Sequence, residues 1–225
     1  MNMQKLSFLL VIPVLFGCQN SNTLPTKIRG SGTVKSETRE VQPFDRVSIA
    51  GAANVEIVAG QPAATCELKF DDNLLEHVST LVEDGELKIK FLGALSSPNV
   101  LQVKLATPHL SKFTASGSIA GKVVNVDEPR LELGMSGATE IECTGKVETL
   151  DIDGSGVSKF NCLALAADAV TIDIAGDGTA DVQAAKSLKV DVSGAANIRY
   201  VGSPEIEKHV SGTGAVQPME PQSQQ

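Results

Sequence analysis

The chain has 225 residues, a formal net charge of −8, no Trp, one Tyr and seven Phe. This acidic balance disfavours nucleic acid and anionic lipid headgroups as partners. The chain also has few of the aromatic side chains on which sugar rings commonly stack.

The first 17 residues have the features of an export signal. A basic Lys5 precedes an apolar run at positions 6–16, which is too short to span a bilayer as a helix. The following Leu15-Phe-Gly-Cys18 resembles the lipobox of bacterial lipoproteins, in which the Cys is acylated and becomes the first mature residue. We therefore expect a lipid anchor at Cys18. Gln19 and not Asp follows the Cys, which by resemblance to the lipoprotein sorting rules of Gram-negative bacteria implies an outer-membrane lipoprotein or a cell-surface location. A secretory signal with an incidental Cys is the alternative.

The mature chain would have 208 residues, which suits one all-β domain. We expect residues 1–17 to be the signal peptide, 18–29 a flexible tether, 30–217 the folded domain and 218–225 a disordered tail rich in Gln and Pro.

Strand signals begin early in the domain but are irregular there. Residues 47–58 and 66–70 predict strands, 72–77 a short helical turn, and 79–91 a hairpin whose turn is Glu83-Asp-Gly-Glu86. We interpret this region as the first coils of a repeat structure together with an end cap.

A Ser-Gly or Asp-Gly pair then recurs along the C-terminal half of the chain. The glycines are Gly117, Gly137, Gly156, Gly178, Gly194 and Gly212. Their steps of 20, 19, 22, 16 and 18 residues are typical of a solenoid with coils of about 19 residues.

Positions on either side of these glycines alternate between apolar and polar residues, as in β-strands. Each coil is therefore expected to contain a strand, a corner at the Gly and a second strand. A Ser at a corner can hydrogen-bond to backbone, which explains the serine column without catalysis. The pattern predicts an all-β fold and, more finely, a parallel β-helix.

The mature chain retains Cys66, Cys143 and Cys162, besides the anchor. Cys143 and Cys162 fall in the same column of adjacent coils, about 5 Å apart, which a disulfide permits. Two buried free thiols are the alternative, because a straight stack does not give ideal disulfide torsions.

Outward acids crowd two neighbouring coils and could bind a cation such as Ca²⁺. The candidates are Asp151, Asp153 and Asp173, with Asp177 and Asp181 nearby. Solvated surface carboxylates explain the same cluster without an ion, and we expect no metal and no cofactor.

Four segments together resemble the head GIN domain family of auto-transporter adhesins. They are Gly30-Ser-Gly-Thr-Val-Lys35, Arg39-Glu-Val-Gln-Pro-Phe-Asp-Arg-Val47, Asp72-Asn-Leu-Leu75 and Asp84-Gly-Glu-Leu-Lys-Ile89, followed by the Ser-Gly corners up to Ser211-Gly-Thr-Gly214. The resemblance covers roughly residues 30–217. It implies a right-handed parallel β-helix on exported or surface-anchored bacterial proteins, and it supplies no catalytic residues.

We therefore expect a non-enzymatic binding or structural module of the cell envelope, an adhesin whose ligand is an envelope or extracellular protein or glycan. Flat β faces and open solenoid ends are also compatible with homo-oligomers. The alternative is a β-helical carbohydrate-active enzyme, a polysaccharide lyase or hydrolase. Its candidate residues are Asp151, Asp153, Lys189, Asp191 and Arg199.

Overall fold

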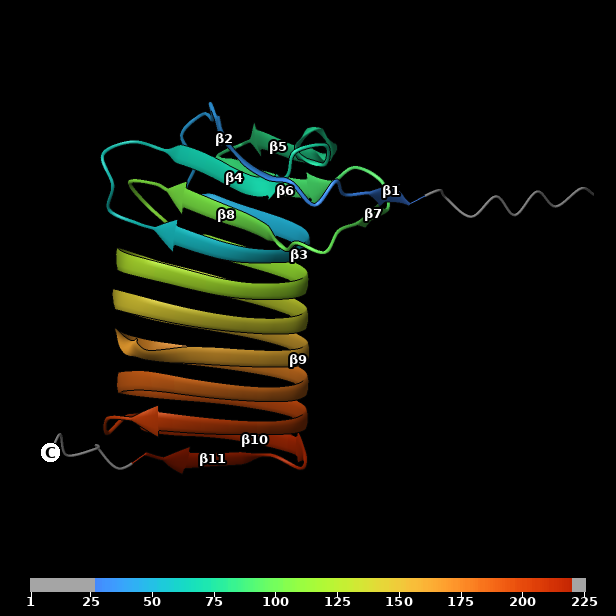
Figure 1. Cartoon of the computed structure of the whole chain (residues 1–225). Coiled ribbons are helices and arrows are strands. Elements are labelled where there is room, and N and C mark those ends of the chain that lie inside the picture. Colours follow the sequence, from blue (N-terminus) through green and yellow to red (C-terminus); the bar gives the residue numbers. More distant parts are fainter. Residues whose placement is uncertain (1–26, 220–225) are drawn as a thin grey trace, which may run out of the picture.

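The computed structural model describes residues 27–219, and nearly all of its regular structure is β-strand (Figure 1). The predicted signal peptide, the acylation site at Cys18 and the ends of the predicted tether and tail lie outside these residues. The elements are β1 Ile28–Arg29, β2 Val34–Arg39, β3 Arg46–Val58, β4 Thr65–Asp71, the short 3₁₀ turn η1 Leu75–His77, β5 Val78–Glu83, β6 Glu86–Phe91, β7 Leu95–Ser96, β8 Leu101–Ala106, β9 Lys112–Val201, β10 Glu205–Gly212 and β11 Ala215–Pro218. The predicted all-β class is confirmed.

Strand β9 is 90 residues long and winds through successive stacked coils (Figure 1). Its first coil pairs in parallel with β3, from Arg46 opposite Lys112 to Val58 opposite Val124. Its last coil pairs in parallel with β10 and β11. Residues at equal positions in neighbouring coils therefore lie side by side, and their side chains form columns down the stack.

The coils turn at a column of stacked glycines. Gly137, Gly156, Gly176 and Gly194 all have positive φ. A Cβ added to Gly176 would lie 2.5 Å from the carbonyl oxygen of Gly156, so only glycine fits this close backbone approach.

The predicted corner at Gly178 is wrong, because Gly176 occupies the stacking position. The steps from Gly117 onward are therefore 20, 19, 20, 18 and 18 residues. Side chains alternate with a period of two, so an alignment error of two residues leaves every residue on its predicted face. For that reason the predicted alternation of buried and exposed residues is unchanged when the corner is moved to Gly176.

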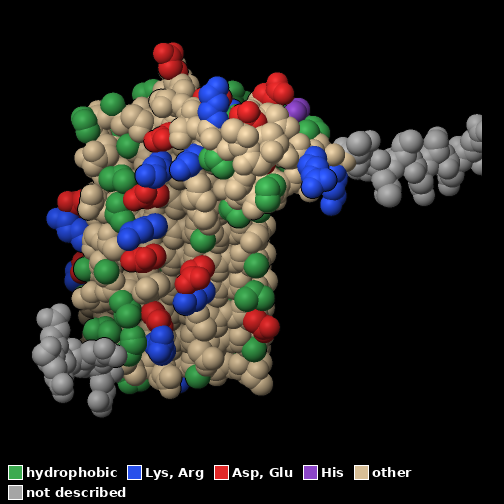
Figure 2. All heavy atoms as spheres, in the orientation of Figure 1, with side chains coloured by type: hydrophobic (Ala, Val, Ile, Leu, Met, Phe, Trp, Pro, Cys, Tyr) green, Lys and Arg blue, Asp and Glu red, His purple; other side chains and the backbone are tan. Residues whose placement is uncertain are grey.

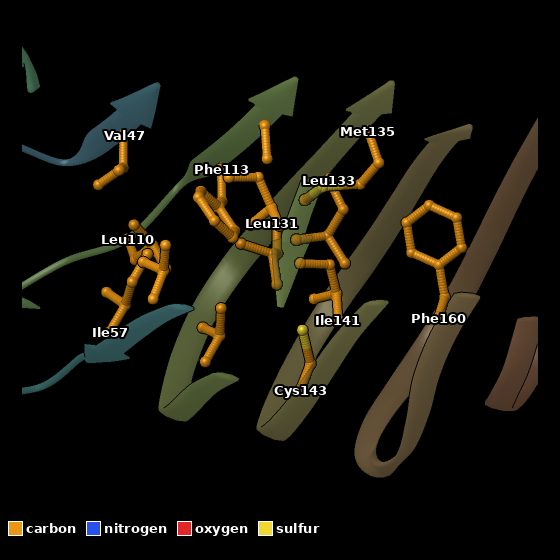
Figure 3. Close-up of a cluster of buried hydrophobic side chains, with 14 of the residues drawn as sticks. Val47, Ile57, Leu110, Phe113, Leu131, Leu133, Met135, Ile141, Cys143 and Phe160 are labelled. Atoms are coloured by element: carbon orange, nitrogen blue, oxygen red, sulfur yellow. The ribbon is translucent and has the colours of Figure 1, made fainter. Parts of the chain in front are cut away.

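The interior of the stack is filled by apolar columns (Figure 3). Leu131, Leu133 and Met135 project inward from one strand of a coil, and Ile141 and Cys143 from the next; each is at most 2% exposed. A single coil could not enclose these side chains, since each column is covered by the coils above and below it. Full burial of a Leu or Met contributes roughly 1.5–3 kcal/mol.

The N-terminal segment ends the stack with antiparallel strands. On one side of the first coil, β8 pairs in parallel with β3, and then β4 and β2 follow in antiparallel order. On the side of this coil that precedes Gly51, β6 pairs in parallel with residues 46–50 of β3 and forms a hairpin with β5. The turn residues of the hairpin, Asp84 and Gly85, have φ of 50° and 78°. Both positive values suit a two-residue hairpin turn.

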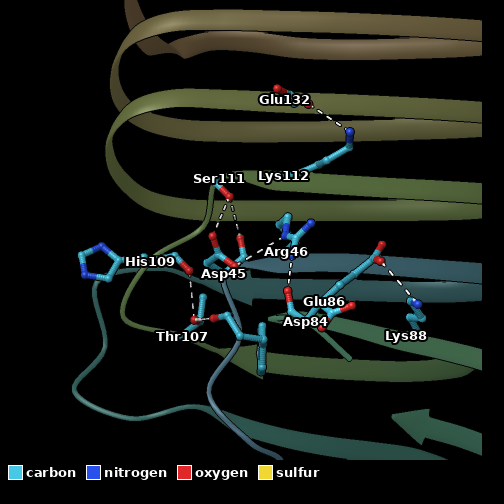
Figure 4. A network of polar contacts seen from close by, with 11 residues as sticks. Asp45, Arg46, Asp84, Glu86, Lys88, Thr107, His109, Ser111, Lys112 and Glu132 are labelled. Carbon is cyan, nitrogen blue, oxygen red and sulfur yellow. Dashed lines mark hydrogen bonds and ion pairs between the residues drawn. The ribbon is translucent and has the colours of Figure 1, made fainter. Parts of the chain in front are cut away.

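Polar contacts join this cap to the first coil (Figure 4). The Ser111 hydroxyl lies 3.0 Å from the Asp45 carboxylate, and the buried Thr107 hydroxyl reaches the backbone carbonyls of Phe44 and His109. These bonds satisfy polar groups at the entry to β9, where the regular pairing of the coils begins.

Candidate binding surface

A column of mostly charged side chains crosses the outward face of the stack, five residues after each stacked glycine from Gly51 to Gly194. Within the coils its members are Glu56, Lys122, Glu142, Asn161, Asp181 and Arg199. Each stands between two inward-facing residues on its strand, so strand alternation directs it to solvent.

The same column continues into the cap. Lys104 of β8 lies opposite Glu56, and Glu67 of β4 lies opposite Lys104. We call the set of Glu67, Lys104, Glu56, Lys122, Glu142, Asn161, Asp181 and Arg199 the charge ladder. Figure 2 shows acidic and basic side chains alternating down this face. Opposite charges on adjacent strands attract, so the ladder also helps to hold the coils in register.

Two pairs of opposite charge within the ladder lie within ion-pair distance, one of them hydrogen-bonded. The Arg199 guanidinium donates to both Asp181 carboxylate oxygens, at 2.7 and 2.5 Å, and this hydrogen bonding raises the pKa of Arg199. Lys122 Nζ lies 4.0 Å from Glu142. Beside the ladder, Lys159 Nζ lies 2.7 Å from Glu140, whose hydrogen bond raises the pKa of Lys159.

A groove of about 420 Å³ lies beside the upper part of the ladder. It forms where Ala120 follows Asn54 in the neighbouring outward column, since a methyl group there leaves space between longer side chains. The groove is lined by polar and charged side chains that include Gln102, Lys104, Lys122, Glu140, Glu142 and Asn161. Such a lining suits a polar ligand.

Ion pairs also link neighbouring coils on the strand that precedes the glycine corner. Lys112 Nζ lies 3.0 Å from Glu132 (Figure 4), Arg130 lies 2.9 Å from Asp151, and Lys189 lies 3.4 Å from Glu207. The hydrogen bond from Lys112 lowers the pKa of Glu132.

The corrected register changes the grouping of the predicted metal-binding acids. Asp173 shares a column with Asp153 and Asp191, not with Asp151, and His209 extends that column opposite Asp191. Asp151 instead pairs with Arg130. Across residues 27–219, no group of three His, Cys, Asp or Glu side chains is arranged to hold a metal ion.

Cys143 and Cys162 are buried free thiols in adjacent coils. A hydrogen bond with Cys162 and burial raise the pKa of the Cys143 thiol well above its usual value. Burial likewise raises the pKa of Cys66, to about 11. Thiols with raised pKa values are poor nucleophiles, so a catalytic role for Cys66 and Cys143 is disfavoured.

The residues named for the enzyme alternative do not form one group. Asp151 and Lys189 lie on the strand before the corner, whereas Arg199 lies after it and pairs with Asp181. A hollow of about 310 Å³ lies over the corner serines, and Asp153 is the single acidic residue that lines it. The groove beside the charge ladder, which the sequence interpretation missed, contains three carboxylates, those of Glu56, Glu140 and Glu142.

A second feature missed from the sequence is a polar clamp on the N-terminal segment. Asp71 is fully buried and accepts hydrogen bonds from Ser97 and Asn99. Burial would raise the pKa of Asp71, but the bonds from Asn99, Ser97 and the backbone of Gly32 outweigh it and hold that pKa below its usual value. A side chain at Gly30 would collide with Asp71, since a Cβ there would lie 1.7 Å from its carboxylate oxygen.

The neighbouring residues complete the clamp. The Ser31 hydroxyl donates to Asp72 at 2.5 Å, and the Asn73 amide donates to the Arg29 carbonyl at 2.9 Å. Two of the segments that carry the family resemblance, those beginning at Gly30 and Asp72, therefore bind each other. The clamp fixes the point at which the chain enters the domain.

Stacked parallel coils, an antiparallel cap and an exposed charge ladder define a class of repetitive all-β proteins with extended surfaces. A family described as "putative auto-transporter adhesin, head GIN domain" matches residues 43–204, and the chain belongs to this family.

Solved structures share the fold at low identity. A protein of Bacteroides fragilis described as a putative adhesin has 17% identity and a TM-score of 0.65, over 85% of this chain and 100% of that one. Two proteins of Parabacteroides distasonis, described as a putative adhesin and a putative lipid binding protein, have 21% and 20% identity and TM-scores of 0.56 and 0.55. They cover 86% and 87% of this chain and are themselves covered completely.

No curated protein matches the chain. Within residues 27–219, no helix is long and apolar enough to cross a bilayer.

Proposed function

We propose that the protein is a lipid-anchored, non-enzymatic binding module of the bacterial cell surface, and that its charge ladder is the recognition surface. The stacked coils would form a right-handed parallel β-helix, as the family resemblance implies. The observation that carries the proposal is the ladder itself, an exposed column that spans the cap and the coils and borders a polar groove.

The family and the solved structures support an adhesive role, since the family and two of those proteins bear the description adhesin. An alternating ladder suits a polar partner of mixed charge better than a polyanion or a polycation, because each cation is flanked by an anion. A surface protein, or a glycan that carries both amino and acidic groups, has that chemistry.

The position of the clamp supports anchoring through the N-terminus. Ile28 lies ten residue steps after Cys18, so this part of the tether can span at most ~36 Å. The clamp at Asp71 and Asn73 holds the first described residues against the cap. A force applied to the bound partner would thus be transmitted through the stacked coils and the clamp to the membrane.

Membrane fractionation tests the anchor. In the bacterium that produces the protein, we expect the wild-type chain in the outer-membrane fraction and accessible to protease on intact cells, and we expect Cys18→Ser to release it in soluble form. A Cys18→Ser chain that stays in the membrane fraction would show that acylation of Cys18 is not the anchor.

The enzyme alternative now rests on the three carboxylates of the groove, because catalytic glycosidases use paired acids. Incubation of Glu56→Gln, Glu140→Gln and wild-type protein with a panel of acidic and neutral polysaccharides distinguishes the two. We expect no release of reducing ends or unsaturated products by the wild type; release that Glu56→Gln or Glu140→Gln abolishes would establish the enzyme.

A further inference from the structure

The C-terminal end of the stack exposes the edge of β10, and among the residues that the structure describes no strand pairs with its outer side. Three positions of β10 point inward: Ile206, Lys208 and Val210. Their partners in the preceding coil are Leu188, Val190 and Val192, which are all buried. An exposed edge of this kind is a template for pairing with another strand.

Lys208 interrupts an otherwise apolar column. The equivalent positions of the preceding coils are Leu133, Ile152, Ile172 and Val190, each at most 2% exposed. Lys208 continues this column in the terminal coil, and within residues 27–219 no further coil covers it. A charge is therefore placed where continuation of the stack would bury it.

The rest of β10 is suited to pairing with a second copy of itself. If two β10 strands met in antiparallel order about a two-fold axis at Lys208, Ile206 would face Val210 and Glu207 would face His209. The first pair is apolar and 40% and 36% exposed, and the second can be oppositely charged. Lys208 alone would face its own copy.

The second strand of the terminal coil has a related feature. β11 ends at Pro218, which pairs in register with Tyr200. A Pro has no backbone N–H to donate to an added strand, and edge strands commonly carry Pro or an inward charge for this reason.

We propose that Lys208 prevents end-to-end pairing of two copies of this protein, so that the exposed C-terminal end does not extend into a continuous sheet. Two ammonium groups would have to lose water and approach each other within an apolar column, which is strongly unfavourable.

Light scattering during size-exclusion chromatography tests this proposal with the full chain carrying Cys18→Ser. We expect a monomer for that chain and, at the same concentration, a twofold mass or higher for Lys208→Val, which restores the residue of the preceding coil. Lys208→Arg retains the charge and should remain monomeric. If circular dichroism shows that Lys208→Val does not fold, Lys208→Gln replaces it in the test, because it removes the charge without adding apolar bulk.

Adding Ile206→Asp to Lys208→Val should return the mass to the monomer value, because it places a charge in the proposed contact. A monomeric mass for the folded uncharged variants would overturn the proposal. So would association of the parent chain that Ile206→Asp abolishes, since Lys208 would then not block pairing.

Discussion

At the scale of single residues, the stacked glycines determine where each coil turns. Gly176 has φ of +131° and an adjacent backbone only 2.5 Å from any added Cβ, whereas at Gly178 the nearest atom would be Cγ2 of Ile174 at 2.9 Å. A strained backbone of this kind costs roughly 1–3 kcal/mol, and the overlap adds to it. We expect Gly176→Ala to lower the free energy of unfolding by about 2 kcal/mol or more, as measured by urea denaturation.

The control for this prediction is Gly178→Ala, which needs no positive φ. It should cost clearly less than Gly176→Ala. A larger loss of stability for Gly178→Ala than for Gly176→Ala would instead place the corner at Gly178.

Asp71 is expected to couple folding to pH. Its folded pKa is lowered, so its contribution to stability is complete above its unfolded pKa of about 3.9 and is lost as pH falls through the folded value. Asp71→Asn should cost ~1–3 kcal/mol at pH 7, because the new amide cannot accept all three hydrogen bonds.

Urea denaturation of the wild type and Asp71→Asn from pH 7 to pH 3 measures this difference. The gap between the two should narrow below about pH 4. A gap that is independent of pH would mean that the Asp71 carboxylate does not act as a charged acceptor.

The thiols of the stack offer a further test. If Cys66, Cys143 and Cys162 are free as the structure has them, a thiol reagent on denatured, unreduced protein should count three besides Cys18. A count of one would establish a disulfide between Cys143 and Cys162. On native protein the reaction should be slow, because all three are buried.

At the scale of strands and coils, the ion pairs between neighbours should have a measurable coupling. Arg199 and Asp181 form the pair with two contacts in the charge ladder, and the Asp181 side chain is only 14% exposed. A double-mutant cycle of Arg199→Ala and Asp181→Ala should give a coupling free energy of roughly 0.5–1 kcal/mol. The coupling should shrink in 1 M NaCl; one that salt leaves unchanged would point to packing instead of charge.

Much of the coil pattern was predictable from the sequence, because apolar side chains alternate with a period of two around a recurring glycine. Strands near 47–58 and 66–70 and the hairpin turn at Asp84-Gly85 agree with the structure. The corner at Gly176 could not be predicted, because the pair Asp177-Gly178 resembles the Ser-Gly pairs in sequence. Only the close backbone contact with Gly156 identifies Gly176 as the corner.

The charge ladder and the clamp could not be predicted from the sequence, for a different reason. The ladder joins residues from four strands, β3, β4, β8 and β9. Lys104 enters it through the parallel pairing of β8 with β3, and Glu67 through the antiparallel pairing of β4 with β8. The clamp joins Gly30, Asp71 and Asn99, which are far apart in the chain. A glycine column aligned on Gly176 would have shown the coil part of the ladder, but no local pattern shows the cap part.

At the scale of the whole molecule, the anchor, the clamp, the coils and the ladder form one path from the membrane to a partner. Adhesion of cells to surfaces coated with mucin, fibronectin or peptidoglycan tests that account most directly. The variant Lys104→Glu/Lys122→Glu changes the ladder, and Lys146→Glu/Lys186→Glu makes the same change of net charge at lysines that pair with Asp127 and Asp168 elsewhere.

We predict that cells producing the wild type bind at least one coating better than a deletion strain. The ladder variant should lose that adhesion, and the control variant should keep it, with both proteins present at the surface in equal amounts. Equal adhesion by the ladder variant and the wild type would contradict the assignment of the charge ladder as the recognition surface.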